Sequence, residues 1–257
     1  MDDNVKSRME FAIEIKSKCC AGPILSILQK NAVKVISSDL SKQQIIVESE
    51  KTFQEVQNLI ESTGVRAALM GQGSTAGNGH MGAAVAMINA DAVKGVVRMI
   101  QINEDQCLFE GTLDGLSPGN HSLNIHEYGD LSDGCRNCGD HYNPFGMSHG
   151  RRSDPNRHVG DLGNIVADES GRSAFRFTDN MVKVWDVIGR SLVVHNEPDN
   201  FNKNVNNSEN HSTAVGCAII ARSAGLLQNA KRICLCDGIP VWEERNVPNA
   251  GIERQKL

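Results

Sequence analysis

The sequence predicts an α+β multidomain fold: a βαββαβ domain, then an all-β domain, then a short C-terminal tail. Three observations indicate this organisation. Helix and strand patterns follow the order βαββαβ up to Gly73, short alternating segments replace the helical period from Met81 onward, and no strong periodicity survives after Leu227. We therefore expect a first domain at 1–73, a linker at 74–80, a second domain at 81–226 and a tail at 227–257.

The first domain has six segments whose patterns alternate between strand and helix. In order, they are EFAIEI, ILSILQKN, VKVISSDL, QQIIVES, TFQEVQNLIESTG and RAALMGQG. Two split βαβ units in this order form the ferredoxin-like plan, in which the loop after the first strand is free to carry a ligand site. That loop contains Cys19 and Cys20. Adjacent cysteines have poor geometry for sharing one ion, so a metal site and a packing or capping role at the helix start both remain open.

The second domain consists of short strand-like segments separated by turn signals such as SPGN and DESGR. The segments are AAVAMI, GVVRMIQI, CLFEGTL, HSLNIHEY, SAFRFTD, RSLVVH and GCAIIARS. One long stretch rich in Gly, Asn and His, from Gly129 to Gly163, interrupts them. This pattern predicts a β-sandwich or barrel that carries a functional loop.

Charge and cysteine content narrow the classes of function. The 257 residues carry a formal net charge of −5, and no run of Lys or Arg exceeds a pair, so the basic footprint of a nucleic-acid or anionic-membrane binder is missing. The N-terminus starts with acids and no segment approaches bilayer-spanning length, so we expect a cytoplasmic protein. In a reducing compartment, 8 cysteines indicate metal or redox chemistry, although Cys107 fits a small core hydrophobe.

The densest cluster of candidate ligands lies in the long stretch HYNPFGMSHGRRSDPNRHVGDLG. It offers three imidazoles and one carboxylate on what we expect to be one loop: His141, His149, His158 and Asp161. That donor set completes a closed tetrahedral zinc shell, and a metal could fold the loop around itself. The alternative is a solvated His-rich loop, because the spacing matches no standard helix or finger.

Other His and Cys residues give weaker signals. Cys135 and Cys138 form a C-x-x-C pair, which fits redox chemistry, the edge of a metal site or no function at all. His126 and His195 lie in predicted strands, where an isolated His is usually a satisfied core or edge residue.

Two tail cysteines, Cys234 and Cys236, form a C-x-C pair. Soft thiolates select Cu(I), and a pair on an extended tail can pass its metal on by ligand exchange. A pair of incidental cysteines and a small dithiol redox switch are the alternatives.

At GDHYNP, NRHVGDLGN and DVIGRSLVVH the central region resembles Cu/Zn superoxide dismutase, over roughly residues 81–224. The preceding ferredoxin-like unit and the trailing RICLCDG and VWEER extend the likeness, so that nearly the whole chain resembles the copper chaperones for superoxide dismutase. The resemblance implies a metallochaperone-like first domain, a dismutase-like Greek-key second domain and a C-x-C third segment.

The resemblance also implies roles for particular residues. The zinc ligands of the family fall on His141, His149, His158 and Asp161, and its structural disulfide falls on Cys135 and Cys217. Asp199 aligns with a dismutase carboxylate that contacts metal ligands and joins the two metal sites. We expect Asp199 to orient zinc-bound His149.

The chain departs from the dismutase at the copper site. Copper ligands fall on Asn124, His126, His141 and His195, so an amide stands where the first imidazole belongs. The arginine that draws superoxide toward copper aligns with Ala214. A carboxamide oxygen is a hard, weak ligand, so we expect a degraded copper site and no dismutase activity.

The first domain departs from its family too. Metallochaperones of this type carry M-x-C-x-x-C, whereas Ile15 and Ser17 stand at the Met and first Cys positions, and only Cys20 keeps its place. We expect inefficient copper acquisition here, and a domain that serves docking or stability.

The sequence thus predicts a non-enzymatic chaperone with structural Zn(II) and Cu(I) as cargo. Its expected partner is Cu/Zn superoxide dismutase, bound as a heterodimer through the dismutase-like domain, with a homodimer through the same domain as a possibility. Expected actions are Cu(I) delivery and formation of the target's disulfide. The competing hypotheses are an active dismutase with accessory domains and a zinc-stabilised binding module without copper delivery.

Overall fold

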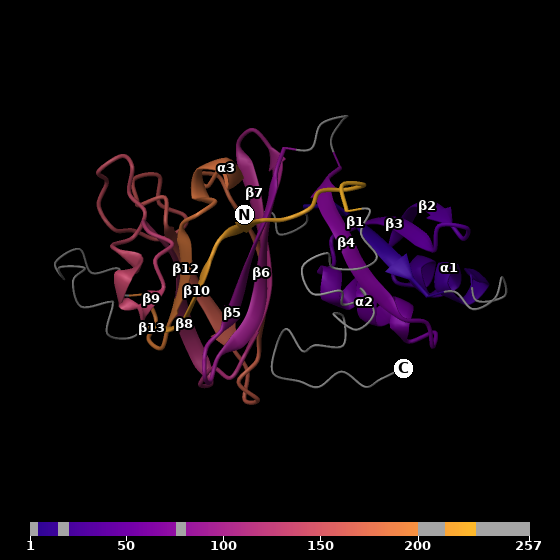
Figure 1. Ribbon diagram of the computed structural model, residues 1–257, viewed down its shortest axis with the longest axis horizontal. Coiled ribbons are helices and arrows are strands. Elements are labelled where there is room, and N and C mark those ends of the chain that lie inside the picture. Colours follow the sequence, from indigo (N-terminus) through magenta and orange to yellow (C-terminus); the bar gives the residue numbers. More distant parts are fainter. Residues whose placement is uncertain (1–4, 15–20, 76–80, 200–213, 230–257) are drawn as a thin grey trace.

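The structure, a computed structural model, describes residues 5–14, 21–75, 81–199 and 214–229. These residues form two domains that lie side by side, the first mixed α and β and the second almost entirely β (Figure 1). The predicted fold class is confirmed.

The first domain has the predicted βαββαβ order. Its elements are β1 (Ser7–Ile13), α1 (Ala21–Lys30), β2 (Lys34–Asp39), β3 (Gln44–Ser49), α2 (Phe53–Glu61) and β4 (Ala67–Ser74). The four strands form an antiparallel sheet in the order β2-β3-β1-β4. Helix α2 begins at a capping box, in which the Thr52 hydroxyl accepts from the Glu55 amide at 3.2 Å and the Glu55 carboxylate accepts from the Thr52 amide at 2.8 Å.

The two faces of this sheet have different partners. Because side chains alternate along a strand, Met9 and Phe11 of β1 pack in one hydrophobic core with Leu28 of α1 and Val56 of α2. Glu10 lies between these two apolar residues and points to the opposite face, yet it is only 3% exposed. The second domain and the chain that follows it therefore cover the face that the helices leave open.

The second domain is a two-sheet β-structure with antiparallel pairing throughout. Its strands are β5 (Ala83–Asn89), β6 (Lys94–Asn103), β7 (Gln106–Asp114), β8 (Gly119–His126), β9 (Ser132–Cys135), β10 (Asp161–Ala167), β11 (Ser173–Asp179), β12 (Ser191–His195), β13 (Ala214–Ile219) and β14 (Ala221–Arg222). One sheet has the order β10-β8-β12-β13 and the other β11-β7-β6-β5-β14.

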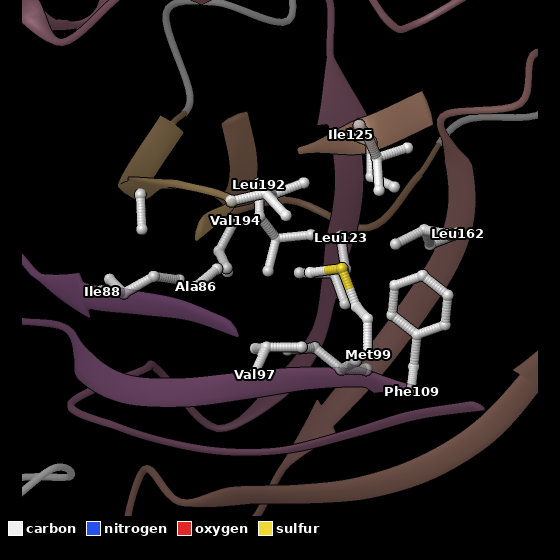
Figure 2. Packing of buried hydrophobic residues seen from close by; sticks show 14 of the residues in the cluster. Ala86, Ile88, Val97, Met99, Phe109, Leu123, Ile125, Leu162, Leu192 and Val194 are labelled. Carbon is white, nitrogen blue, oxygen red and sulfur yellow. The ribbon is translucent and has the colours of Figure 1, made fainter. Parts of the chain in front are cut away.

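The core of the second domain lies between its sheets. Figure 2 shows Met99 and Phe109 of one sheet facing Leu123 and Leu192 of the other, all fully buried. The alternating segments predict this arrangement because every second residue is apolar and turns inward. The polar loops lie outside the core, where they are free to carry the site.

The sequence patterns do not predict several short elements. Strands β9 and β10, the 3-10 turn at Arg136–Cys138 and helix α3 (Val184–Val187) lie where the sequence shows no clear period. The expectation that all four candidate zinc ligands share one loop is wrong for Asp161, which is the first residue of β10. Gly and Asn within DLGNIVA dilute the apolar alternation, so the strand is hard to see in the sequence.

The two domains meet through buried polar contacts. Gln72 of β4 donates to Glu110 of β7 at 2.6 Å, and Ser74 donates to the carbonyl of Ile102 at 2.6 Å. Arg176 of β11 forms an ion pair with Glu110 and donates to the carbonyl of Val5 at 2.8 Å. The first domain is thereby attached to the outer face of the five-stranded sheet.

Candidate metal centre

A buried cation holds the long loop between β9 and β10 in place. Arg157 is 2% exposed and donates to the carbonyls of His158 at 2.9 Å and Asp161 at 3.0 Å, while it forms an ion pair with Asp179 of β11. Since the accepting groups belong to the backbone, the guanidinium fixes the path of the chain itself. The role of Arg157 is not predictable from the sequence, because an Arg in a polar loop is usually solvated.

The loop brings all four predicted zinc ligands together. Asp161 Oδ1 lies 2.8 Å from Nδ1 of His141, 3.0 Å from Nδ1 of His149 and 3.2 Å from Nδ1 of His158. The ligand atoms of the four residues all lie within 4.8 Å of one another. The second oxygen, Asp161 Oδ2, accepts from the amides of Gly150 at 3.0 Å and His158 at 3.1 Å, which fixes the carboxylate. Three imidazole nitrogens and one carboxylate oxygen converging in this way fit a closed tetrahedral zinc shell.

Electrostatics make this cluster favourable for a cation. Burial opposes the charged form of His149, but the carboxylates of Asp161 and Asp199 outweigh it and raise the pKa of that imidazole to about 10. Burial likewise disfavours the Asp161 anion, but hydrogen bonds from the three histidines hold its pKa well below the usual range. The buried carboxylate therefore needs positive charge beside it, which a proton or a bound divalent ion supplies.

Asp199 holds one ligand from behind. Its Oδ1 lies 2.7 Å from His149 Nε2, and its backbone amide donates to Asn164 at 2.7 Å. His149 is thus set between two carboxylates, with Nδ1 toward Asp161 and Nε2 toward Asp199. A carboxylate on the far nitrogen orients a ligating imidazole and increases its basicity.

A second group of imidazoles lies next to the first and shares His141. His126, His141 and His195 are buried, and their ligand atoms lie within 4.8 Å of one another. His126 is oriented by its Nδ1, which lies 2.7 Å from the carbonyl of Gly139. His141 has its Nδ1 on Asp161, while its Nε2 is buried without a hydrogen-bond partner among the described residues. These three residues are the histidines that the sequence analysis assigned to the degraded copper site.

Asn124 and Ala214 leave this second group incomplete. Asn124 lies two residues before His126 on β8 and is 1% exposed, and within the described part of the chain neither atom of its amide has a hydrogen-bond partner. Ala214 is paired with His195 in the register of β12 and β13, so a methyl group stands where the dismutase resemblance calls for a cation. Three imidazoles without a fourth, and without a nearby arginine at this position, fit stable redox copper poorly.

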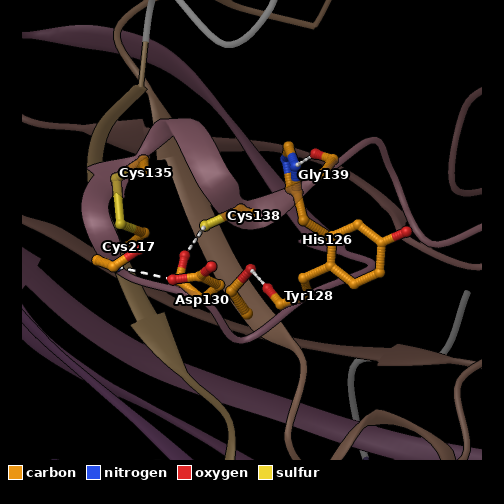
Figure 3. The surroundings of a disulfide bond; sticks show 9 residues. His126, Tyr128, Asp130, Cys135, Cys138, Gly139 and Cys217 are labelled. Carbon is orange, nitrogen blue, oxygen red and sulfur yellow. Dashed lines mark hydrogen bonds between the residues drawn. A yellow bond between two sulfur atoms is a disulfide. The ribbon is translucent and has the colours of Figure 1, made fainter.

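A disulfide joins the start of the loop to the last strand of its sheet. Cys135 at the end of β9 is bonded to Cys217 of β13, with 5.7 Å between their Cα atoms (Figure 3). Cys138, the other member of the C-x-x-C pair, is buried and lies with its sulfur 3.9 Å from the carbonyl of Asp130. Burial raises the pKa of the Cys138 thiol, so it is protonated at neutral pH. The pair thus divides into one bonded cysteine and one buried thiol.

Four candidate residues lie outside the described residues. They are Cys19 and Cys20 of the first domain and Cys234 and Cys236 of the tail. Within the described segments, no helix is long and apolar enough to cross a membrane.

The chain is similar to proteins of two related kinds. Residues 93–220 match the copper/zinc superoxide dismutase family. A solved structure, the clock protein EA4, is 33% identical and covers 57% of this chain and 98% of its own, with a TM-score of 0.52.

Relatives that match both domains and the tail are named copper chaperones rather than dismutases. The copper chaperone for superoxide dismutase from Rattus norvegicus is 45% identical over 99% of this chain and 94% of its own length. The protein of the same name from Homo sapiens is 45% identical over 96% of this chain and 92% of its own length. A chloroplastic/cytosolic form from Arabidopsis thaliana is 34% identical over 92% of this chain and 70% of its own length. The similarity thus extends through both domains and the tail, and the chain belongs to the family of copper chaperones for superoxide dismutase.

Proposed function

We propose that this chain delivers Cu(I) to Cu/Zn superoxide dismutase and promotes formation of its disulfide. One observation carries the proposal: within a dismutase-like domain the zinc-type cluster is complete, whereas the copper-type group has Asn124 in place of an imidazole. A domain that keeps the framework of a dismutase but cannot hold redox copper suits recognition better than catalysis. The names of the full-length relatives support the same function.

Zinc has a structural role in this proposal. His141, His149, His158 and Asp161 would hold it, and bound Zn(II) would supply a closed, redox-inactive cross-link between the loop and β10. Arg157 holds the backbone at His158, and Asp199 orients the His149 imidazole.

The surface proposed to dock the dismutase, which we call the docking face, consists of four exposed apolar residues. They are Met87 of β5 at 61% exposure, Trp185 of α3 at 51%, Tyr128 after β8 at 57% and Ile219 of β13 at 44%. Exposed large apolar side chains gathered on neighbouring elements are typical of protein interaction sites.

Backbone contacts bring the elements of the docking face together. The Ile220 amide donates to the Arg190 carbonyl at 2.8 Å, and the Ser191 hydroxyl donates to the Tyr128 carbonyl at 2.6 Å. Strand β14, which follows Ile219, pairs with β5. We propose a dismutase subunit as the occupant, because the domain that carries the face has the dismutase fold itself. A second copy of this chain is the competing occupant.

The tail would carry the cargo. Cys234 and Cys236 supply soft thiolates for Cu(I), and the imidazoles of an empty dismutase site accept it by ligand replacement. The disulfide step is separate from Cu(I) binding. Once Cu(I) has left, an oxidant such as molecular oxygen would take two electrons and two protons from the dithiol of Cys234 and Cys236, which then form a disulfide. The target's two thiols then lose two electrons and two protons to that bond, which becomes a dithiol. We place the delivery in the cytoplasm, where such a dithiol remains reduced and able to bind copper.

The test is activation of copper-free, disulfide-reduced superoxide dismutase by the Cu(I)-loaded protein. We expect the parent to restore dismutase activity and a variant with Cys234→Ser and Cys236→Ser to restore none. A matched variant with Cys19→Ser and Cys20→Ser removes the same number of thiols from the first domain. We expect it to remain active, because that domain lacks the full metallochaperone motif.

Two other outcomes of this test would favour the competing functions. If the parent itself dismutes superoxide while the target stays inactive, the chain is an active dismutase. If the tail variant activates the target as well as the parent does, the tail carries no copper. If neither protein activates the target and the parent does not dismute superoxide, the zinc-stabilised binding module is the better description.

A further inference from the structure

The chain that follows β14 returns to the first domain. We call residues 223–229 the tail root; four residues separate it from Cys234. Figure 1 shows the segment after β13 crossing from the second domain to the end of the first-domain sheet, beside β1 and β4. The Ser223 amide still donates to Ala83 of the second domain at 2.9 Å, whereas the Gln72 amide of β4 donates to the Ala224 carbonyl at 3.4 Å. The chain therefore changes domain between these two residues.

A buried carboxylate of the first domain holds the tail root. Glu10 of β1 is 3% exposed, and its Oε2 accepts from the backbone amide of Leu227 at 2.5 Å. Its Oε1 accepts from the Gln44 side chain at 2.5 Å. A carboxylate is costly to bury unless its oxygens accept hydrogen bonds. Here, one of the two comes from a residue 217 positions further along the chain.

Strand β4 of the first domain carries two glycines where it contacts the tail root. A Cβ on Gly71 would lie 2.3 Å from the Gly225 carbonyl oxygen, and a Cβ on Gly73 would lie 3.2 Å from the side chain of Leu226. Real Cβ atoms do not approach a backbone oxygen that closely, so any side chain at position 71 displaces the root. The close approach is therefore built into β4.

The root has a backbone conformation that its own residues do not favour. Leu227 has φ of 61°, in the region that glycine adopts most readily, within a turn closed by the Gln228 amide on the Gly225 carbonyl at 3.2 Å. A non-glycine residue persists there when its surroundings determine the conformation. The hydrogen bond from the Leu227 amide to Glu10 of the first domain helps to determine this conformation.

We propose that Glu10 and Gly71 are positioning residues for copper transfer: the first domain fixes the point from which the tail cysteines start. This inference rests on the proposed delivery function. Cys236 follows Gln228 by eight residues, so the dithiol reaches at most roughly 28 Å from the root. Fixing the root confines the dithiol to that volume and raises its effective concentration at a docked client. A first domain without a full copper motif thus has a use that requires no copper.

The first measurement is hydrogen exchange at the Leu227 amide in the full-length protein. We expect protection in the parent and exchange at least about tenfold faster in Glu10→Ala, because a hydrogen bond to a charged acceptor is lost. Gly71→Ala displaces the root from the other side of the contact and should have the same effect. The matched control is Glu48→Gln on β3, whose carboxylate pairs with Arg8 at 3.1 Å in the same sheet but does not contact the root.

The second measurement is the rate of dismutase activation by Cu(I)-loaded protein at rising chaperone concentration. We expect Glu10→Ala and Gly71→Ala to lower the maximal rate at least about threefold, because the dithiol spreads over a larger volume. The half-saturating concentration should stay unchanged, since the docking face is untouched. Glu48→Gln should match the parent in both.

The outcomes separate this inference from the proposed function. An unprotected Leu227 amide in the parent, or faster exchange with no change in maximal rate, overturns the positioning role. If the parent activates no dismutase, the delivery function fails and the positioning role fails with it, while the exchange data still decide whether Glu10 holds the root. If Glu10→Ala unfolds the first domain, shown by exchange throughout β1 and β3, Gly71→Ala alone supports or overturns the proposal.

Discussion

At the scale of single residues, His141 is the link between the two groups of imidazoles. Its Nδ1 lies 2.8 Å from Asp161 in the zinc-type cluster, and its ring lies 5.0 Å from that of His126 in the copper-type group. An imidazole has two nitrogens on opposite sides of the ring, so one side chain can serve both. What separates the two groups chemically is therefore Asn124, because it alone replaces an imidazole.

We expect Asn124→His to give the protein a second bound metal ion. The new imidazole would lie on the same face of β8 as His126 and complete four nitrogen donors, a set that suits Cu(II). Cu(II) content after dialysis, with electron paramagnetic resonance of the bound ion, is the measurement. Asn124→Ala is the control, because it removes the amide without adding a donor. Equal copper retention by the two variants would show that Asn124 is not what disables the group.

At the scale of elements, a buried ion pair links the loop before β10 to a neighbouring strand. Arg157 and Asp179 are almost completely buried, and the guanidinium also binds the loop's own carbonyls. The zinc ligands are therefore held by β11, a strand of the other sheet.

We expect Asp179→Asn to destabilise the protein by about 3–5 kcal/mol, because it leaves a buried guanidinium without its anion. The same change should make the zinc-type cluster lose metal faster to a chelator. Thermal unfolding and the rate of zinc release measure the two effects. The exposed pair Arg136 and Asp133 provides the control, since Asp133→Asn should alter neither. Zinc release at the parent's rate would mean that the loop is held by other contacts.

The sequence predicts the regular elements of this fold better than its irregular ones. Apolar alternation and helical periodicity identify β1 to β8 and both helices of the first domain, because most of these elements bury one face. Strand β2 is the exception, since none of its residues is buried. Strand β10 has too many small and polar residues to show the pattern, and the role of Arg157 depends on a strand that is distant in sequence. The zinc-type ligands came from local spacing and resemblance together, whereas the buried Glu10 looks in the sequence like an ordinary solvent-facing position of β1.

At the scale of the whole molecule, the two domains are joined by a carboxylate between two arginines. Glu110 of β7 is fully buried and lies opposite Arg98 of β6 and Arg176 of β11 in the strand registers. Gln72 of the first domain donates to the same carboxylate, and Arg98 lies over the Phe53 ring at 5.0 Å. One side chain thus balances charge within a sheet and accepts a hydrogen bond from the other domain.

We expect Glu110→Ala to uncouple the domains, because both arginines lose their counter-ion and Gln72 loses its acceptor. Calorimetry should show one unfolding transition in the parent and two in the variant, with the first domain melting first. Glu50→Ala removes an exposed carboxylate that lies 3.9 Å from Lys6 and should leave a single transition. A single transition in Glu110→Ala as well would show that the remaining contacts suffice to couple the domains.

The amide at Asn124 has a consequence for the direction in which cargo moves. A tail tethered to its own dismutase-like domain would meet that domain's imidazoles at a local concentration on the order of millimolar, far above that of a separate client. With a fourth imidazole, the nearest binding site for Cu(I) would lie on the carrier itself. Transfer to the client would then compete with binding of Cu(I) at that site. Under the proposed delivery, an amide that cannot close the site would make the carrier the weaker acceptor, and the ion would continue to the client even when the client is scarce.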